Sequence, residues 1–377
     1  MRVKTATGGS LYITAREFEK DTTGMVLWKR ELGSSIVARM LTASPSNVIV
    51  GTRNGMAYSI DSESGDIIWE YDAGAPWGGG VIDRGKLYFG TAAGQVHCIE
   101  KDTGRMTWKT TLDPSGFVEP PAVYTGGKGK FLIVGSSSGK VYALNPVSGI
   151  TRWAYQASGA VTNTPSAGLG MVFFGDWDQK LYAIDAVTGE EVWVKQLGRQ
   201  VYYSPAGNSL LYRNTLFSVT PADSHSGGSF LYALNPLNGQ EIWKGVNWRS
   251  FMEPSLPVYS QKRAGGQPFI LAPDYSGRIT AYYQSNGEIP WHLQGYSTLF
   301  GGVPNLDRIY VTGGARGVLA IHAGNTQTDF KIRDTFLFVD PLVLKTYNED
   351  TKSGFSHMIL QGDNRGTIWA IRVPVAP

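Results

Sequence analysis

The chain has 377 residues, of which 42% are hydrophobic and 17% are charged. Its net charge of +3 is spread along the chain, which excludes a long basic arm for nucleic acid or anionic lipid. A single cysteine, Cys98, excludes an intramolecular disulfide and a cysteine-based zinc cluster. No stretch approaches the roughly 20 apolar residues of a membrane span. The 47 glycines and 19 prolines instead indicate short strands joined by tight turns.

One pattern recurs along most of the chain. A strand ending in Asp or Asn is followed by a Thr or Ser, a Gly, three residues and a Trp, and residues 181–193 form its clearest copy. The Gly-x-x-x-Trp element ends at Trp28, Trp69, Trp108, Trp153, Trp193, Trp243 and Trp291. Successive tryptophans are 39 to 50 residues apart. A near-constant period of this length, with four strands in each unit, predicts a β-propeller.

Each part of the repeat has a physical role. The glycine supplies the positive φ of a tight turn, and the preceding polar side chain can accept hydrogen bonds from the turn backbone. The tryptophan is a large apolar plate that can wedge between neighbouring blades, while its indole N–H donates to a carbonyl. We therefore expect these tryptophans to be structural.

The number of strands sets the number of blades. Inner strands are predicted near Ile36, Trp77, Phe117, Val161, Val201, Phe251, Leu299 and Phe336. Second strands are predicted near Val48, Leu87, Leu132, Val172, Leu216, Phe269, Ile309 and Met358. We therefore predict an all-β, eight-bladed propeller with four antiparallel strands per blade, forming a single domain over residues 1–377. The seventh blade is degenerate, because Phe330 stands where the other repeats have tryptophan.

The two chain ends are expected to complete one blade. Residues 366–372 form a third strand with no outer strand after it, and residues 25–29 can supply that strand. This pairing would close the ring. Residues 11–15 also have the pattern of a third strand, so two N-terminal segments compete for this place.

The repeat resembles the tryptophan-docking motif of the quinoprotein (pyrroloquinoline-quinone-like) propeller family, approximately Ala-x-Asp-x-x-Thr-Gly-x-x-x-Trp. The copies that end at Trp193, Trp69 and Trp108 match best. The resemblance covers nearly the whole chain. It implies one of two kinds of protein: a large quinone-dependent dehydrogenase, or a smaller non-catalytic propeller of the BamB-like type that serves outer-membrane assembly. Eight blades in fewer than 400 residues favour the second kind.

Two departures from the family patterns bear on this choice. The dehydrogenases are longer, and many have a vicinal cysteine pair that this chain lacks. BamB-like proteins carry a lipidated N-terminal cysteine, and the polar start after Met1 has neither this cysteine nor an apolar signal core. We expect a periplasmic or envelope-associated protein whose targeting segment was removed. A cytoplasmic protein and a domain excised from a longer chain are the alternatives.

The inner strands of a propeller face its central channel. Counting 11 residues past six of the motif tryptophans gives Arg39, Gly80, Glu119, Thr164, Ser204 and Gly302 as channel-lining candidates. Glu119, Glu253 and Asp340 share the pattern apolar-apolar-acid-Pro. These three carboxylates are candidate ligands for a hard cation such as Ca²⁺. The alternative is that they are solvated or paired, for example Asp340 with Arg39.

Aromatic and arginine side chains outside the repeat are candidate interface anchors, because Trp, Tyr and Arg dominate binding hot spots. These candidates are Trp77, Trp177, Tyr203, Trp248 and Arg249. Local packing beneath a loop is the alternative. The five histidines lie in different repeats without metal-ligand spacing, and no nucleophile elbow or phosphate loop is present. We therefore predict no catalytic site, and expect His97 and His322 to be ordinary strand residues.

Two functional hypotheses follow. The first is a non-enzymatic scaffold without a cofactor, which presents its loops to other proteins of a bacterial envelope complex and binds no nucleic acid. This hypothesis depends largely on the family resemblance. The second is a sensor or enzyme that holds a small ligand, such as a quinone or Ca²⁺, in the channel. Convergent polar groups with room for a ligand would favour the second.

Overall fold

In the computed structural model, the described residues are 2–4, 10–12, 26–114, 116, 119–198, 209–220, 229–247, 258–259, 267–274, 278–294, 299–302, 308–312, 318–322, 328–332, 342–344 and 355–374. Within these ranges every regular element is a β-strand. The strands form eight four-stranded antiparallel sheets and one two-stranded pair. The predicted all-β fold with four-stranded antiparallel sheets is confirmed.

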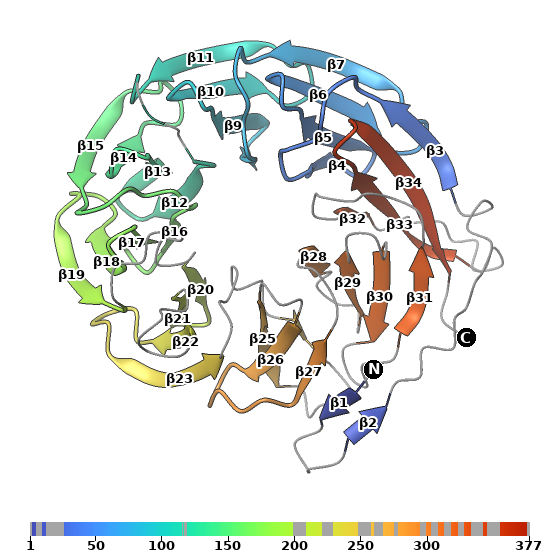
Figure 1. Cartoon of the computed structure of the whole chain (residues 1–377). Helices are drawn as coiled ribbons and strands as arrows, with labels where there is room; N and C mark the ends of the chain where they lie inside the picture. The colour runs from blue at the N-terminus through green and yellow to red at the C-terminus, as the bar shows by residue number, and fades with distance from the viewer. Residues whose placement is uncertain are drawn as a thin grey trace.

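The sheets follow one another around a central axis (Figure 1), with the first strand of a sheet innermost and the fourth on the rim. The first two sheets contain β4 (Leu41–Ser44), β5 (Asn47–Gly51), β6 (Met56–Asp61) and β7 (Ile67–Asp72), then β8 (Gly80–Asp83), β9 (Lys86–Gly90), β10 (Gln95–Glu100) and β11 (Met106–Thr111). The next two contain β12 (Ala122–Gly126), β13 (Gly129–Gly135), β14 (Lys140–Leu144) and β15 (Thr151–Gln156), then β16 (Ser166–Gly168), β17 (Met171–Gly175), β18 (Lys180–Asp185) and β19 (Glu191–Gln196).

The second half of the chain repeats this arrangement. Its first two sheets contain β20 (Leu210–Tyr212), β21 (Thr215–Val219), β22 (Ser229–Leu234) and β23 (Glu241–Asn247), then β24 (Val258–Tyr259), β25 (Pro268–Pro273), β26 (Arg278–Tyr283) and β27 (Trp291–Gln294). The last two contain β28 (Leu299–Gly302), β29 (Arg308–Thr312), β30 (Val318–His322) and β31 (Thr328–Ile332), then β32 (Leu342–Leu344), β33 (Phe355–Gly362), β34 (Thr367–Pro374) and β3 (Val26–Glu31).

The last of these sheets joins the two ends of the chain. Strand β3 pairs antiparallel with β34, so that Trp28 lies opposite Ala370 and Lys29 opposite Trp369. The other N-terminal segment takes a different partner, because β2 (Ser10–Tyr12) pairs with β1 (Arg2–Lys4). Of the two competing segments, the one that contains Trp28 is therefore the neighbour of β34.

Burial along the strands follows their position in the sheet. The middle strands are buried on both faces, as in β17, whose five residues Met-Val-Phe-Phe-Gly are all buried. The outer strands alternate between exposed and half-buried residues, as in β19. This difference arises because side chains alternate between the two faces of a strand, and only the middle strands have a neighbouring sheet over both faces.

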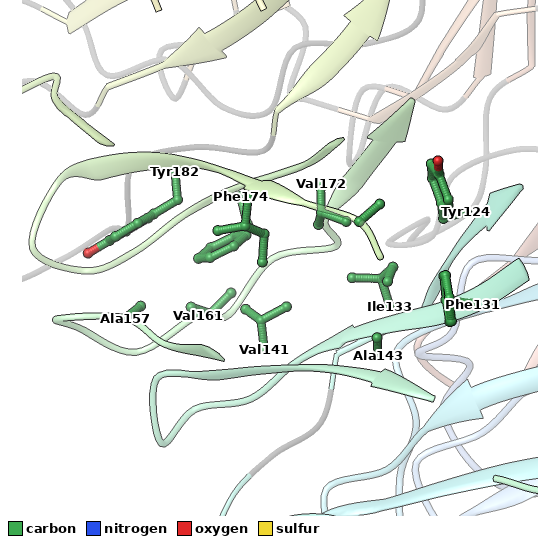
Figure 2. Close-up of a cluster of buried hydrophobic side chains, with 12 residues drawn as sticks. Tyr124, Phe131, Ile133, Val141, Ala143, Ala157, Val161, Val172, Phe174 and Tyr182 are labelled. Carbon is green, nitrogen blue, oxygen red and sulfur yellow. The ribbon is translucent and has the colours of Figure 1, made fainter. Parts of the chain in front are cut away.

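The largest cores lie between adjacent sheets. Figure 2 shows one of them, where β13 and β14 of one sheet face β17 and β18 of the next. Val141, Val172 and Phe174 are almost fully buried there, and the rings of Phe174 and Tyr182 stack with centroids 5.0 Å apart. Each such aliphatic or aromatic side chain stabilises the fold by about 1.5–3 kcal/mol. A single sheet could not bury these residues, so neighbouring sheets depend on each other.

The antiparallel order also separates two faces of the molecule. In each sheet, the turn between strands one and two lies at the same end as the turn between strands three and four. We call this end the turn face. The turn between strands two and three, and the connection to the next sheet, lie at the opposite end, which we call the connection face.

Candidate functional site

Six of the repeated tryptophans join one sheet to the next. Every donor is an indole N–H in the fourth strand of one sheet, and every acceptor is a main-chain carbonyl in the turn between strands three and four of the next sheet. The pairs are Trp28 with Ser62 (2.9 Å), Trp69 with Lys101 (3.0 Å), Trp108 with Pro146 (3.1 Å), Trp153 with Ala186 (3.1 Å), Trp193 with Pro236 (2.9 Å) and Trp243 with Gln284 (3.0 Å). Trp291 is buried beside Phe269 in β25.

The motif glycine makes room for the tryptophan of the preceding sheet. Gly189 has φ +76, and a Cβ atom there would lie 2.7 Å from the Trp153 ring. Neighbouring side chains reinforce the joint, since Arg30 donates to the Gly65 carbonyl (2.6 Å) and Lys195 to the Gly239 carbonyl (2.8 Å). The motif tryptophan and glycine, at their constant spacing, thus hold each outer turn in position on the turn face.

At the connection face, segments from successive sheets meet around Gly79. A Cβ on Gly79 would lie 3.5 Å from Pro120 and 3.8 Å from the Cβ of Arg39. The Arg39 amide donates to the Gly78 carbonyl (3.2 Å), and the Glu119 amide donates to the Gly135 carbonyl (3.1 Å). Arg39 is exposed and Glu119 is half-buried. The structure therefore brings the channel candidates Arg39 and Glu119 to adjoining segments.

The remaining channel and metal candidates divide into two groups. Thr164 is described and half-buried, two residues before β16. Gly80 begins β8 and Gly302 ends β28. Outside the described residues lie Ser204, Glu253 and Asp340. Among the side chains that are described, no three His, Cys, Asp or Glu residues are placed to hold a metal ion.

The prediction that Trp77 is an exposed interface anchor is wrong. Its side chain is 1% exposed and packs against Phe89, with ring centroids 4.7 Å apart. Gly51 lies so close that a Cβ there would be 2.5 Å from the indole. Trp77 therefore fills the space between the first two sheets. Trp77 lies three residues before the inner strand β8, and this position did not reveal which way the ring points.

Trp177 is half-buried, and its indole donates to the Thr162 hydroxyl (2.7 Å). It lies on the connection face, in the turn between β17 and β18. The other interface candidates, Tyr203, Trp248 and Arg249, lie outside the described residues.

Sequence reasoning missed the buried carboxylate of Asp176, which has no exposed surface. It accepts hydrogen bonds from the amides of Lys180 (2.9 Å) and Gly159 (3.0 Å) and from the Tyr182 hydroxyl (2.8 Å). Burial is the main cause that raises the pKa of Tyr182 to about 12, so this phenol stays protonated and can donate. The cluster ties the β17–β18 turn to the preceding connection, which is a structural role.

The residue that directly follows the second strand has the same role in other repeats. Asp274 accepts from the Arg278 amide (3.0 Å) and Asp363 from the Thr367 amide (2.8 Å), as Asp176 does from Lys180. Thr91 accepts from the Gln95 amide at 3.3 Å. Aligning the repeats at the end of the second strand, which is Gly90, Gly175 and Gly362 in three of them and Pro273 in the fourth, would have revealed this shared acceptor.

His97 is the buried titratable group between the first two sheets. Its Nδ1 lies 2.9 Å from the Tyr71 hydroxyl and its Nε2 lies 3.3 Å from the side-chain Oε1 of Gln95. Burial, followed by the charge of Lys109, lowers the pKa of His97 to about 4. The imidazole is therefore neutral at pH 7, with Tyr71 donating to Nδ1 and Nε2–H donating to Gln95.

Comparison with known proteins decides the family. The model of the family described as "Outer membrane protein assembly factor BamB" matches residues 14–80, 73–127 and 122–321. The chain belongs to this family. The quinoprotein-like repeat resemblance, closest to the BamB-like propellers, is thereby confirmed.

Individual BamB proteins are distant relatives of the chain. It is 24% identical over 287 residues to the outer membrane protein assembly factor BamB of Bordetella pertussis, which covers 74% of this chain and 71% of the relative. In other BamB relatives the matched part is as little as 50% of their length.

Solved structures establish the propeller fold. The crystal structure of BamB from Moraxella catarrhalis has a TM-score of 0.65 at 17% identity, covering 92% of this chain and 96% of that one. Quinohemoprotein alcohol dehydrogenase from Comamonas testosteroni has the same TM-score at 13% identity, covering 92% of this chain and 76% of that one. The BamB family thus shares its fold with enzymes. In the part of the chain that the structure describes, no helix has the length and hydropathy to span a bilayer.

Proposed function

We propose that the chain is a non-enzymatic scaffold that binds other proteins within an assembly of the bacterial cell envelope, in the periplasm. The observation that carries this proposal is the match of residues 14–321 to the family of outer membrane protein assembly factors. A role in assembly requires surfaces that hold partners in a fixed arrangement. A ring of sheets joined by repeated tryptophan contacts suits that role.

We also propose that the eight sheets form a closed eight-bladed ring. The eight four-stranded sheets and the pairing of β3 with β34 support this architecture. In a closed ring the chain ends share one blade, so no blade is left with an uncovered neighbour. Closure would make the disk rigid, as a scaffold requires.

Exposed apolar residues in the outer turns support protein binding. Val147 is 81% exposed and Leu237 is 63% exposed, at the tips of the β14–β15 and β22–β23 turns. Ile150 and Ile242 lie exposed in or beside the same turns. Covering such exposed apolar side chains with a partner removes apolar surface from water and so makes the free energy of binding more favourable.

Cross-linking in living cells tests the scaffold proposal. A photo-crosslinking amino acid at Val147 or Leu237 is expected to trap a specific envelope protein in the native host. The same amino acid at Arg53, on the connection face, is the matched control and is expected to give a different or weaker product. Failure of all three positions to trap any envelope protein would contradict the proposal.

A second candidate function is the binding of a quinone or a cation in the channel. The fold shared with a quinohemoprotein alcohol dehydrogenase, and the half-buried Glu119 on a segment that adjoins the Arg39 segment, support it. Calorimetric titration of Ca²⁺ and pyrroloquinoline quinone into the protein tests it. Binding that Glu119→Gln weakens by about tenfold would support this function, whereas no heat of binding for either compound would reject it.

A further inference from the structure

In the part of the chain that the structure describes, three turns on the turn face hold bulky side chains in an unfavourable backbone conformation. Arg84 (φ 45), Leu169 (φ 54) and Arg213 (φ 44) each occupy the first position of a two-residue hairpin turn. Asn or Gly is preferred there, because the Cβ of other residues crowds the following carbonyl. All three residues are exposed. Strained residues of this kind cluster at binding sites.

These turns are neighbours on the inner side of the ring. They join the first two strands of the sheets that begin with β8, β16 and β20, and the β12–β13 turn, with exposed Lys128, lies between the first two of them. Lys130 forms an ion pair with Asp83, which links the β8–β9 and β12–β13 turns. Gly168 lies against Leu211, which links the next two sheets. Arg84, Lys128, Leu169 and Arg213 therefore follow one another along an arc, which we call the basic arc.

The outer turns of the same face carry the opposite charge. These turns join the third and fourth strands, which lie towards the rim in Figure 1. Their acidic residues are Asp61, Glu63, Asp66, Glu100, Asp102, Asp185, Glu190 and Glu288. Four bases compensate part of this charge in the described residues: Arg30 pairs with Asp66 (2.9 Å), Lys86 and Arg105 with Glu100, and Lys101 with Asp102. The turn face therefore has a basic inner arc inside an acidic rim.

We propose that the basic arc binds an acidic, extended segment of a partner protein, with an apolar side chain of that segment against Leu169. This inference rests on the proposed scaffold function and specifies the chemistry of the partner. Arg84, Lys128 and Arg213 attract carboxylates. Leu169, which is 48% exposed between the basic positions, offers the apolar contact.

The basic arc inside an acidic rim favours a single extended segment over a flat anionic surface as the ligand. An anionic bilayer laid on the turn face would press its charge against the acidic rim as well as the basic arc. A single acidic segment can follow the arc and leave most of the rim carboxylates in water. Asp185 is within reach of the arc: hydrogen bonds from Thr188 are the main cause that lowers its pKa, and the charge of Lys128 contributes. An acidic segment on the arc is thus repelled by fewer rim carboxylates than a bilayer on the whole turn face would be.

Fluorescence anisotropy with a labelled peptide of about twelve residues, mostly Glu with a central Leu, tests the proposal on the full chain. The test variant combines Arg84→Gln, Lys128→Gln and Arg213→Gln. The matched control combines Arg53→Gln, Lys140→Gln and Arg365→Gln, which are exposed on the connection face. Both variants lose three positive charges from a chain of net charge +3, so overall charge cannot distinguish them.

We expect the test variant to weaken peptide binding by about tenfold or more and the control by less than about twofold. Leu169→Asn, which keeps every charge, is expected to weaken it by about threefold. Absence of peptide binding to the unaltered chain, or equal losses in both triple variants, would overturn the proposal. A third result would also overturn it: the unaltered chain binds phosphatidylserine vesicles but not the peptide, and the test variant no longer binds the vesicles. Cross-linking at Val147 and Leu237 judges the scaffold function separately.

Discussion

The contact between a tryptophan and the glycine of the next sheet is the residue-scale unit of this fold. Gly189 and Gly170 both have positive φ, but only at Gly189 would a Cβ meet a tryptophan ring; at Gly170 nothing lies within 4 Å. Gly170→Ala should cost about 1 kcal/mol from backbone strain alone. Gly189→Ala should cost about 1–3 kcal/mol more, because Trp153 must move. Urea unfolding of the two variants measures the difference, and equal losses would show that docking contributes nothing.

The buried His97 makes stability depend on pH. Its pKa is about 4 in the folded chain and near 6.5 when exposed. Between these values the unfolded chain binds a proton at His97 that the folded chain does not. The free energy of unfolding should therefore fall as the pH drops from about 6.5 to about 4, by at most about 3 kcal/mol from this group.

His97→Gln tests this dependence, since glutamine stays neutral and can still bond Tyr71. The variant should show a flatter profile of unfolding free energy between pH 6.5 and 4 than the unaltered chain. Parallel profiles for the two proteins would mean that His97 does not titrate as described.

Residue type predicts contacts that the repeat enforces and misses those that depend on side-chain direction. Trp153 and Gly189 could be assigned because the motif repeats them with a constant spacing. Trp77 could not, because a ring that precedes an inner strand can point to the channel or to the next sheet. Asp176 was missed because a turn aspartate has the same sequence signature whether its carboxylate is solvated or buried among donors.

At the scale of the element, we expect the hairpin turns of the basic arc to be less stable than the same turns with Asn or Gly at the positive-φ position. Leu169→Asn should raise the free energy of unfolding by about 0.5–1 kcal/mol, because asparagine tolerates positive φ and the leucine side chain is largely exposed. Chemical denaturation measures this gain. A loss of stability would show that Leu169 is held by packing and would remove the strain argument for its role.

Alternating and continuous apolar patterns identified the strands, since rim and middle strands differ in how many faces they bury. Pattern alone could not pair the N-terminal segments. Residues 11–15 and 25–29 are both strand-like, and the choice of 25–29 for β34 depends on the contact of Trp28 with Ser62 in the next sheet. Such a contact between distant parts of the chain is invisible to local periodicity.

For the whole molecule, closure of the ring is testable through β3 and β34. Glu31 and Thr367 lie opposite each other in these strands. The double variant Glu31→Cys, Thr367→Cys should form a disulfide on mild oxidation. The disulfide should raise the free energy of unfolding by about 2–4 kcal/mol, because the bridge closes a very long loop. Each single variant is the control, and Cys98 is buried. A double variant that stays reduced would contradict the pairing of the two ends.

The period of the repeat and the number of strands in each repeat were enough to predict a propeller from the sequence. Function was less accessible, because a propeller with this repeat can serve as an enzyme or as a scaffold, and the difference lies in loops and channel residues that vary between repeats. Glu253 and Asp340 illustrate this, since the repeat predicts their strands and not their surroundings.

Native mass spectrometry of the protein from its own host, with Ca²⁺ and pyrroloquinoline quinone then added, tests the scaffold account most directly. The account predicts the mass of the chain together with a stoichiometric partner protein, and no mass shift from either compound. A stoichiometric quinone or cation on a chain without a protein partner would contradict it and would assign the function to the channel.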